Sequence, residues 1–172
     1  DGDGLSDNYE TLASLTDPLL ADSDADGLSD SEEVFELADG YITDPLDQDT
    51  DDDGLLDGDE GGVDSDGVTT DGTNPSSADT DGDGLYDGQE LGLTEDDVDP
   101  TVTNLTVFIG DEDPTNDPTD PTKADTDGDG LSDGAEDKNL NGAVDAGETD
   151  PYLGDTDNDD IPDYLDTDDD DD

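Results

Sequence analysis

The stretch DTDGDGLSDGAE, residues 125–136, shows the pattern on which most of the chain is built. Aspartates stand at its first, third, fifth and ninth positions, glycine at the sixth and glutamate at the twelfth. This is the spacing D-x-[DN]-x-[DN]-G-x5-E of a twelve-residue calcium loop. Carboxylates at positions one, three and five can point inward as the backbone curls round an ion. Position seven gives its backbone carbonyl, position nine often acts through a water, and the long glutamate closes the site with both oxygens.

The same spacing recurs along the chain. Residues 22–33, 49–60, 79–90 and 137–148 match it in full, and residues 1–10 match it from the third position onward. Residues 155–166 carry Asp160 in place of the glycine and Asp166 in place of the glutamate, which predicts weaker binding there. The predicted metal-binding residues are Asp1, Asp3, Leu5, Asp7, Glu10, Asp22, Asp24, Asp26, Leu28, Asp30, Glu33, Asp49, Asp51, Asp53, Leu55, Asp57, Glu60, Asp79, Asp81, Asp83, Leu85, Asp87, Glu90, Asp125, Asp127, Asp129, Leu131, Asp133, Glu136, Asp137, Asn139, Asn141, Ala143, Asp145, Glu148, Asp155, Asp157, Asp159, Ile161, Asp163 and Asp166.

Two residue types show that these matches are not a by-product of the high aspartate content. The chain has only ten glutamates, and six of them close a loop. Leucine occupies the seventh position in five loops, which predicts a small apolar plug beside each ion. Residues 137–148, DKNLNGAVDAGE, keep the pattern with asparagines at two ligand positions. Because Glu136 ends one loop and Asp137 begins the next, we expect these two loops to form one rigid double site.

The composition predicts that cations are needed for folding. Of 172 residues, 59 are acidic and two are basic, which gives a net charge of −57, and only 26% are hydrophobic. So few apolar side chains bury too little surface to offset the entropy of ordering the backbone. The chain is therefore either disordered or held by cations, and the regular spacing of its acids favours cations. Adaptation to saline water is a second explanation for part of the excess of acidic residues.

The composition also excludes several classes of function. A polyanion has no electrostatic attraction to nucleic acid or to an anionic membrane surface. No apolar stretch is long enough to span a membrane. The chain has no His, Cys or Arg, and each well-spaced set of carboxylates is explained as a metal loop. We therefore expect no enzymatic activity, no nucleic-acid binding and no membrane insertion.

The loops belong to larger repeats that start with Thr, then Asp or Asn, then Pro, as in residues 119–136. The distance from this threonine to the end of its loop does not vary, whereas the linkers between repeats do. Short helices of about two turns are predicted after the loops that end at Glu10 and Glu33. We divide the chain into repeats at 1–97, a spacer at 98–118 and repeats at 119–172. Within the spacer, VTNLTVFIG (residues 102–110) predicts a short strand, a docking edge or a segment that packs locally over its neighbouring loops.

The repeats resemble thrombospondin type 3 repeats, in the cysteine-free form found in prokaryotic surface and secreted proteins. The resemblance covers about residues 1–90 and 119–172. It implies a mostly irregular, calcium-wrapped repeat array, with short helices and little sheet, that forms an extended rod. It also implies several bound Ca²⁺ ions and an extracellular or cell-surface location.

Two functions follow from these features. The first is a structural segment, a rod or filament subunit stiffened by calcium. The second is an acidic calcium buffer or mineral-binding protein, for which shape is unimportant. In the filament form, subunits meet head to tail, and Asp171 of one copy supplies the first position of the loop that continues at Asp1 of the next. The alternative explanation for the incomplete first loop is that the sequence is a slice of a longer chain.

Overall fold

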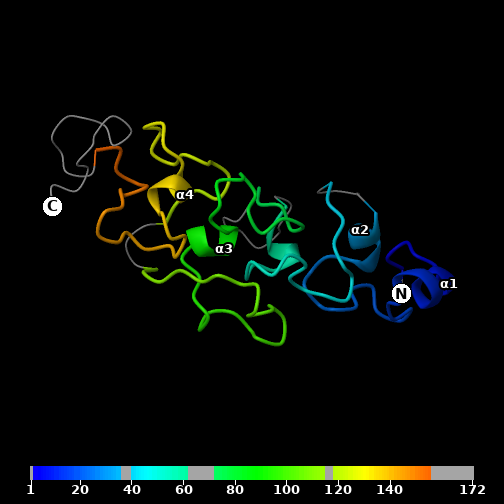
Figure 1. Cartoon of the computed structure of the whole chain (residues 1–172). Helices are drawn as coiled ribbons and strands as arrows, with labels where there is room; N and C mark the ends of the chain where they lie inside the picture. The colour runs from blue at the N-terminus through cyan, green and yellow to red at the C-terminus, as the bar shows by residue number, and fades with distance from the viewer. Residues whose placement is uncertain (1, 36–39, 62–71, 115–117, 156–172) are drawn as a thin grey trace. The chain divides into compact units, whose positions relative to one another are not determined.

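The computed structural model describes residues 2–35, 40–61, 72–114 and 118–155 (Figure 1). The chain divides into two compact units. Unit 1 contains Asp1–Ala78 together with Pro100–Asn104, and unit 2 contains Asp79–Asp99 together with Leu105–Asp172. Part of the spacer therefore belongs to each unit.

The described residues contain only short helical segments, separated by turns and irregular backbone (Figure 1). No strand occurs among them. This confirms the predicted fold class of a mostly irregular repeat array with short helices. The segments are α1 at Asp7–Tyr9, the π-helix η1 at Glu10–Ser14, α2 at Asp30–Val34, the 3₁₀ turn η2 at Asp57–Asp59, α3 at Asp87–Glu90 and α4 at Asp133–Glu136.

Five of these segments begin at the ninth position of an acidic loop. The residue before each start is extended, with φ between −86° and −110°, so the chain turns into a helix only at the ninth position. Ser29 shows the cap, because its side chain accepts a hydrogen bond from the backbone N–H of Glu32. The helices were predicted to follow the loops, but they begin inside them. Residues 10–14 do continue α1 as predicted, and the region after Phe35 lies outside the described residues.

The spacer forms turns and irregular backbone across residues 102–110. Phe108 is buried, whereas Leu105, Val107 and Ile109 are each about 40% exposed. In unit 1, Thr103 donates its hydroxyl to the Asp49 carboxylate, and Asn104 donates its backbone N–H to Asp52 Oδ1 at 2.8 Å. The spacer residues of unit 1 therefore pack on the loop at residues 49–60.

The buried residues of this protein are mainly acids and threonines. Among the described residues, the buried hydrophobic side chains are Leu55, Leu85 and Phe108. Large apolar residues such as Leu12 and Leu19 are 72% and 81% exposed. A core of three apolar side chains contributes roughly 5–9 kcal/mol, since each is worth about 1.5–3 kcal/mol, and ordering the backbone costs about 1–2 kcal/mol per residue. The stability of the fold must therefore depend on how the buried carboxylates are neutralised.

Candidate metal centres

The acidic loops curl as a calcium loop requires. In residues 79–90, Gly84 has φ of +114° and donates its N–H to Asp79 Oδ2 at 3.1 Å, which joins positions six and one. Leu85 donates its N–H to Asp83 Oδ1 at 2.9 Å, which joins positions seven and five. The bond between positions seven and five recurs in the loops that contain Leu5, Leu28, Leu55, Leu131 and Ala143.

A second set of hydrogen bonds closes four of the loops between their second and ninth positions. Thr80 donates its backbone N–H to Asp87 Oδ1 at 2.8 Å and its hydroxyl to Asp87 Oδ2 at 2.6 Å. The same paired bonds join Ser23 to Asp30, Thr50 to Asp57 and Thr126 to Asp133. Each of these four aspartates is at most 1% exposed. The ninth residue is therefore a buried, oriented carboxylate, a role that the sequence did not predict.

The glutamate at the twelfth position is buried in every described loop. Glu10, Glu33, Glu60, Glu90, Glu136 and Glu148 are all less than 9% exposed. Two of them accept a hydroxyl from the next Thr-Asp-Pro step, with Thr43 Oγ1 at 3.3 Å from Glu33 Oε1 and Thr119 Oγ1 at 2.9 Å from Glu90 Oε1. The second oxygen of each, Glu33 Oε2 and Glu90 Oε2, is buried with no hydrogen-bond partner.

These buried acids have no cationic side chain to balance them. The chain has two lysines. Lys123 pairs with Asp120 on the surface, and Lys138 donates to the carbonyl of Gly147. Burial, with the charge of neighbouring aspartates, raises the pKa of Glu33 and Glu90 to about 9 and that of Glu136 to about 8. Without a cation these sites would have to hold protons at neutral pH.

Carboxylates from within one loop lie close enough to share an ion. In residues 22–33, Asp22, Asp24 and Asp26 each place one oxygen within 4.8 Å of the others. Asp49, Asp51 and Asp53 do the same in the next loop. These are the first, third and fifth positions of their loops. Calcium binds oxygens at about 2.3–2.6 Å, so two oxygens on opposite sides of one ion are about 5 Å apart. Either cluster could therefore hold a calcium ion.

Other clusters combine carboxylates from two successive loops. Asp26, Glu33 and Asp57 form one such group, with one oxygen of each within 4.8 Å of the others. Asp3, Glu10 and Asp30 form another, by the same criterion. In both groups the first two residues occupy positions five and twelve, and the third is the ninth residue of the following loop. The spacing within one loop predicts a separate site in each loop and does not predict this combination.

The loop at residues 137–148 is built differently. Asp137 and Glu148 are buried, but Asp145 at the ninth position is exposed. Asp145 Oδ2 accepts a hydrogen bond from Asn139 Nδ2 at 2.9 Å, and Asn141 Nδ2 donates to Glu112 Oε2 at 3.0 Å. The side-chain amides of both asparagines thus donate hydrogen bonds to neighbouring carboxylates. The rigid double site with residues 125–136 stays a prediction.

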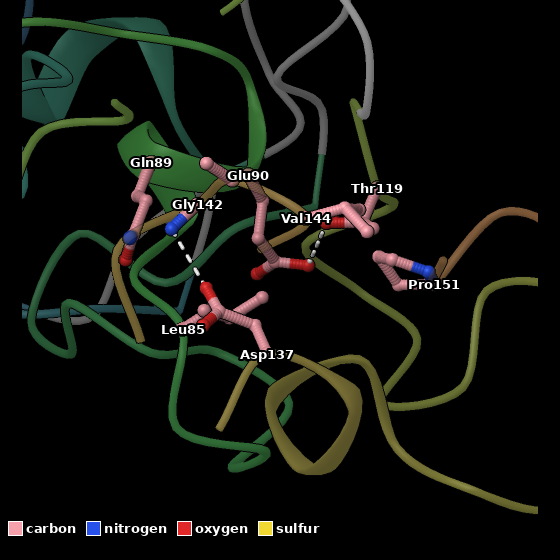
Figure 2. Close-up of a pocket in the computed structure, with 9 residues that line it drawn as sticks. Leu85, Gln89, Glu90, Thr119, Asp137, Gly142, Val144 and Pro151 are labelled. Carbon is pink, nitrogen blue, oxygen red and sulfur yellow. Dashed lines mark hydrogen bonds between the residues drawn. The ribbon is translucent and has the colours of Figure 1, made fainter. Parts of the chain in front are cut away.

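A small pocket in unit 2 is lined by residues of this loop and of residues 79–90 (Figure 2). Leu85, Val144 and Pro151 supply apolar walls, and the carboxylates of Glu90 and Asp137 point into the same region. Asp137 Oδ2 accepts the N–H of Gly142 at 2.7 Å. The pocket shows the apolar residue of position seven lying beside a closing glutamate. Position seven is buried at Leu55 and Leu85, and half-buried at Leu5, Leu28 and Leu131.

Several predicted metal-binding residues lie outside the described part of the chain. Asp155 is described and is half-buried. The aspartates proposed for a head-to-tail junction and the rest of the last loop are not described. These residues are Asp1, Asp157, Asp159, Ile161, Asp163, Asp166 and Asp171.

Sequence reasoning missed three kinds of residue that shape these centres. They are the Ser or Thr at position two, the threonine of the Thr-Asp-Pro step, and the small residue at position ten. The first two recur at fixed places in the repeat, so their recurrence was a usable signal. The role of position ten depends on a neighbouring loop, so no spacing within its own loop indicates it.

Comparison with known proteins agrees with this geometry. A family model for the bacterial TSP3 repeat matches residues 1–21, 22–41, 79–91 and 125–139. No curated protein and no solved structure matches the chain. In the part of the chain that is described, no helix has the length and apolar character needed to cross a membrane. Four segments of the chain are thus similar to the bacterial thrombospondin type 3 repeat, which is a calcium-binding repeat.

Proposed function

We propose that this chain is a structural segment of an extracellular or cell-surface protein, which calcium folds and stiffens. The observation that carries the proposal is the burial of the closing glutamates without a cationic side chain nearby. An uncompensated buried charge costs several kcal/mol, so the ionised glutamates need a bound cation in the folded state. Metal binding and folding are then one process.

The ligand chemistry favours calcium over other cations. The clusters offer only oxygen ligands, and the described loops contain no histidine or cysteine, since the chain has neither. Calcium accepts about six to eight oxygens in irregular geometry, whereas magnesium requires a near-octahedral shell and retains several waters. Flexible loops with many carboxylates suit the larger ion. The rod, the filament and the extracellular location are parts of this proposal and rest on the resemblance and the composition.

A buffer or mineral-binding protein is the alternative function. Such a protein needs ion capacity but no defined fold. Paired hydrogen bonds that orient the ninth carboxylate, as between Thr80 and Asp87, are more than ion capacity requires. They favour the structural role.

The test is to measure the fold with and without calcium. In calcium, we expect a folded chain by circular dichroism and small-angle X-ray scattering. After chelation, the radius of gyration should rise toward the roughly 44 Å of an unfolded chain of this length. A scrambled chain of the same composition is the control, and it should show no comparable folding on adding calcium. A chain that keeps its dimensions and spectrum in excess chelator would refute the proposal.

A further inference from the structure

We propose that calcium sites in this array are shared between successive loops, with ligands from positions five and twelve of one loop and from position nine of the next. The inference rests on the proposed calcium-binding function and deepens it, because it makes each site depend on a neighbouring repeat. The shared clusters lie in unit 1, and unit 2 shows the same contact between position ten of one loop and position five of the loop before it.

The first observation is the position of the carboxylates in unit 1. Asp26 and Glu33 belong to the loop at residues 22–33, and Asp57 belongs to the loop at 49–60. Their relative exposures are 8%, 1% and 1%, and one oxygen of each lies within 4.8 Å of the others. That spread fits three ligands of one ion with bonds of about 2.3–2.6 Å. Asp3, Glu10 and Asp30 repeat the arrangement one loop earlier.

The second observation is that this cluster holds buried polar atoms that lack a protein partner. Glu33 Oε2 and Asp26 Oδ2 are both buried without a hydrogen-bond partner, and so is Glu10 Oε1 in the preceding cluster. Glu33 Oε1 already accepts the hydroxyl of Thr43. Buried polar atoms in proteins are nearly always satisfied, so an oxygen-seeking cation is the natural partner for these.

The third observation is that hydrogen bonds within its own loop fix the orientation of the ninth residue's carboxylate. Both oxygens of Asp57 accept hydrogen bonds from Thr50, the backbone N–H at 2.8 Å and the hydroxyl at 2.6 Å. Each carboxylate oxygen has a further lone pair. Asp57 is therefore held rigidly by residues 49–60 while it faces the loop at 22–33.

The fourth observation is the contact made by position ten, which fixes the register between loops. A side-chain Cβ added to Gly58 would lie 2.3 Å from the carbonyl oxygen of Asp26. Ser31 occupies the same position one loop earlier and donates its hydroxyl to the carbonyl of Asp3 at 2.7 Å. In these two loops position ten therefore packs against position five of the loop before it, and only a small residue fits.

Unit 2 contains the same register. A Cβ on Gly134 would lie 2.5 Å from the carbonyl oxygen of Asp83, and the Gly134 N–H donates to the Asp83 carboxylate. Burial is the main cause of the raised pKa of Asp133, the hydrogen bonds from Thr126 oppose it, and the nearby charge of Asp83 adds to it. The ninth and tenth residues of the loop at 125–136 thus face position five of the loop at 79–90.

The loop at residues 137–148 lacks these contacts between loops. It follows Glu136 directly, without a Thr-Asp-Pro step. Its Asp145 and Ala146 are exposed, and Asp145 bonds to Asn139 of its own loop. The sharing therefore belongs to loops that are introduced by the Thr-Asp-Pro step.

The test is a calcium titration of the full ¹⁵N-labelled chain, followed at the backbone amides of Leu28 and Leu55. Each amide donates to the position-five carboxylate of its own loop, so it reports on that loop. In Asp57→Asn, the calcium midpoint at Leu28 should rise about tenfold or more, because a charged ligand is lost from the preceding loop's site. Asp59→Asn makes the same charge change two residues away, and it should leave the Leu28 midpoint within about twofold of the parent.

Two further variants distinguish the loss of contact between loops from effects within one loop, and one amide in unit 2 reports whether the chain still folds. Gly58→Ala keeps every carboxylate but forces the loops apart, and it should also raise the Leu28 midpoint. Thr50→Val loosens Asp57 within its own loop and should affect Leu55 as well. The Leu131 amide in unit 2 should keep its parental midpoint, which shows that the chain folds.

The result that would overturn the inference is a parental Leu28 midpoint in both Asp57→Asn and Gly58→Ala. If Leu28 and Leu55 of the parent chain do not respond to calcium at all, the proposed function itself fails.

Discussion

At the scale of single residues, the threonine of the Thr-Asp-Pro step holds the glutamate that closes the preceding loop. Thr119 donates its hydroxyl to Glu90 Oε1 at 2.9 Å and its backbone N–H to the Glu90 carbonyl at 3.2 Å. Thr43 makes the same two contacts with Glu33. Since the hydroxyl fixes one oxygen, the other oxygen of each glutamate has a defined position before an ion binds.

This contact predicts the effect of removing the hydroxyl. Thr119→Val keeps the shape of the buried side chain but leaves Glu90 Oε1 without its donor. We expect calcium affinity in unit 2 to fall by roughly fivefold, in line with about 1 kcal/mol for one hydrogen bond. Isothermal titration calorimetry measures the change. Thr119→Ser, which keeps the donor, should recover most of the affinity, and equal losses in the two variants would contradict the positioning role.

At the scale of the element, the acidic loop and the helical turn at its end are one unit. The ninth residue both starts the helix and closes the loop, because its carboxylate accepts two hydrogen bonds from position two. In residues 125–136, its N–H also reaches back to the carbonyl of Ala124 at 3.2 Å. The helices have three to five residues, too few to form alone. Their helical geometry is therefore a consequence of loop closure.

Loop closure can be weakened without touching an acid. In Thr126→Val, the hydroxyl bond to Asp133 Oδ2 is lost, and the buried carboxylate keeps only the N–H donor. We expect the calcium-loaded protein to lose about 1–2 kcal/mol of unfolding free energy, measured by urea denaturation.

The control is Thr122→Val. Its hydroxyl bonds to Asp120 at an exposed site, where water replaces it. This variant should unfold at nearly the parental urea concentration. If both variants have the same midpoint, the bond between positions two and nine contributes nothing to closure.

At the scale of the whole molecule, protons and calcium compete for the same buried carboxylates. Burial and neighbouring aspartates raise the pKa of Glu33 and Glu90 to about 9, from an ordinary value of 4.5. A carboxyl whose pKa is higher in the folded state stabilises the calcium-free fold below its unfolded pKa. That stability is lost as the pH rises through the folded value. The calcium-free fold is therefore favoured by acid and weakened between about pH 4.5 and pH 9.

Small-angle scattering of the calcium-free chain tests this dependence. We expect a smaller radius of gyration at about pH 5.5 than at about pH 9.5, because protonation neutralises the buried glutamates. The sequence pI is about 4.1, so the chain stays anionic at both values. With calcium bound, the radius should change much less, since the ion replaces the protons. Equal radii for the calcium-free chain at both pH values would contradict the prediction.

Local features of this fold could be predicted from the sequence, and contacts between loops could not. The curl at Gly84 follows from a twelve-residue pattern, so its positive φ was foreseeable. The pairing of Thr80 with Asp87 spans seven residues and could have been found from the recurring Ser or Thr at position two. Asp57 was placed correctly in its own loop, but its approach to Glu33 depends on how two loops pack. No spacing within one loop encodes that packing.

The apolar positions show the same limit. Leucine at position seven predicted a plug in each loop, yet Leu85 is 3% exposed while Leu28 is only half-buried. From its β-branched residues the spacer was predicted to be a strand or docking edge, or else to pack locally over its neighbouring loops, and residues 102–110 form turns and irregular backbone. In both cases the surrounding loops decide the burial, and the short apolar run has too few neighbours of its own kind to impose a strand.

The return of Thr103 and Asn104 to the loop at residues 49–60 has a practical consequence for dissecting this protein. Those two residues follow a complete further repeat. Unit 1 therefore consists of two segments of the chain, which are separated in sequence by residues of unit 2. A fragment that stops at residue 97 looks like a clean set of repeats, but it lacks the hydroxyl on Asp49 and the N–H on Asp52. Protease-resistant pieces of the chain need not coincide with whole repeats, and a fragment intended to carry the first repeats intact should extend past Asn104.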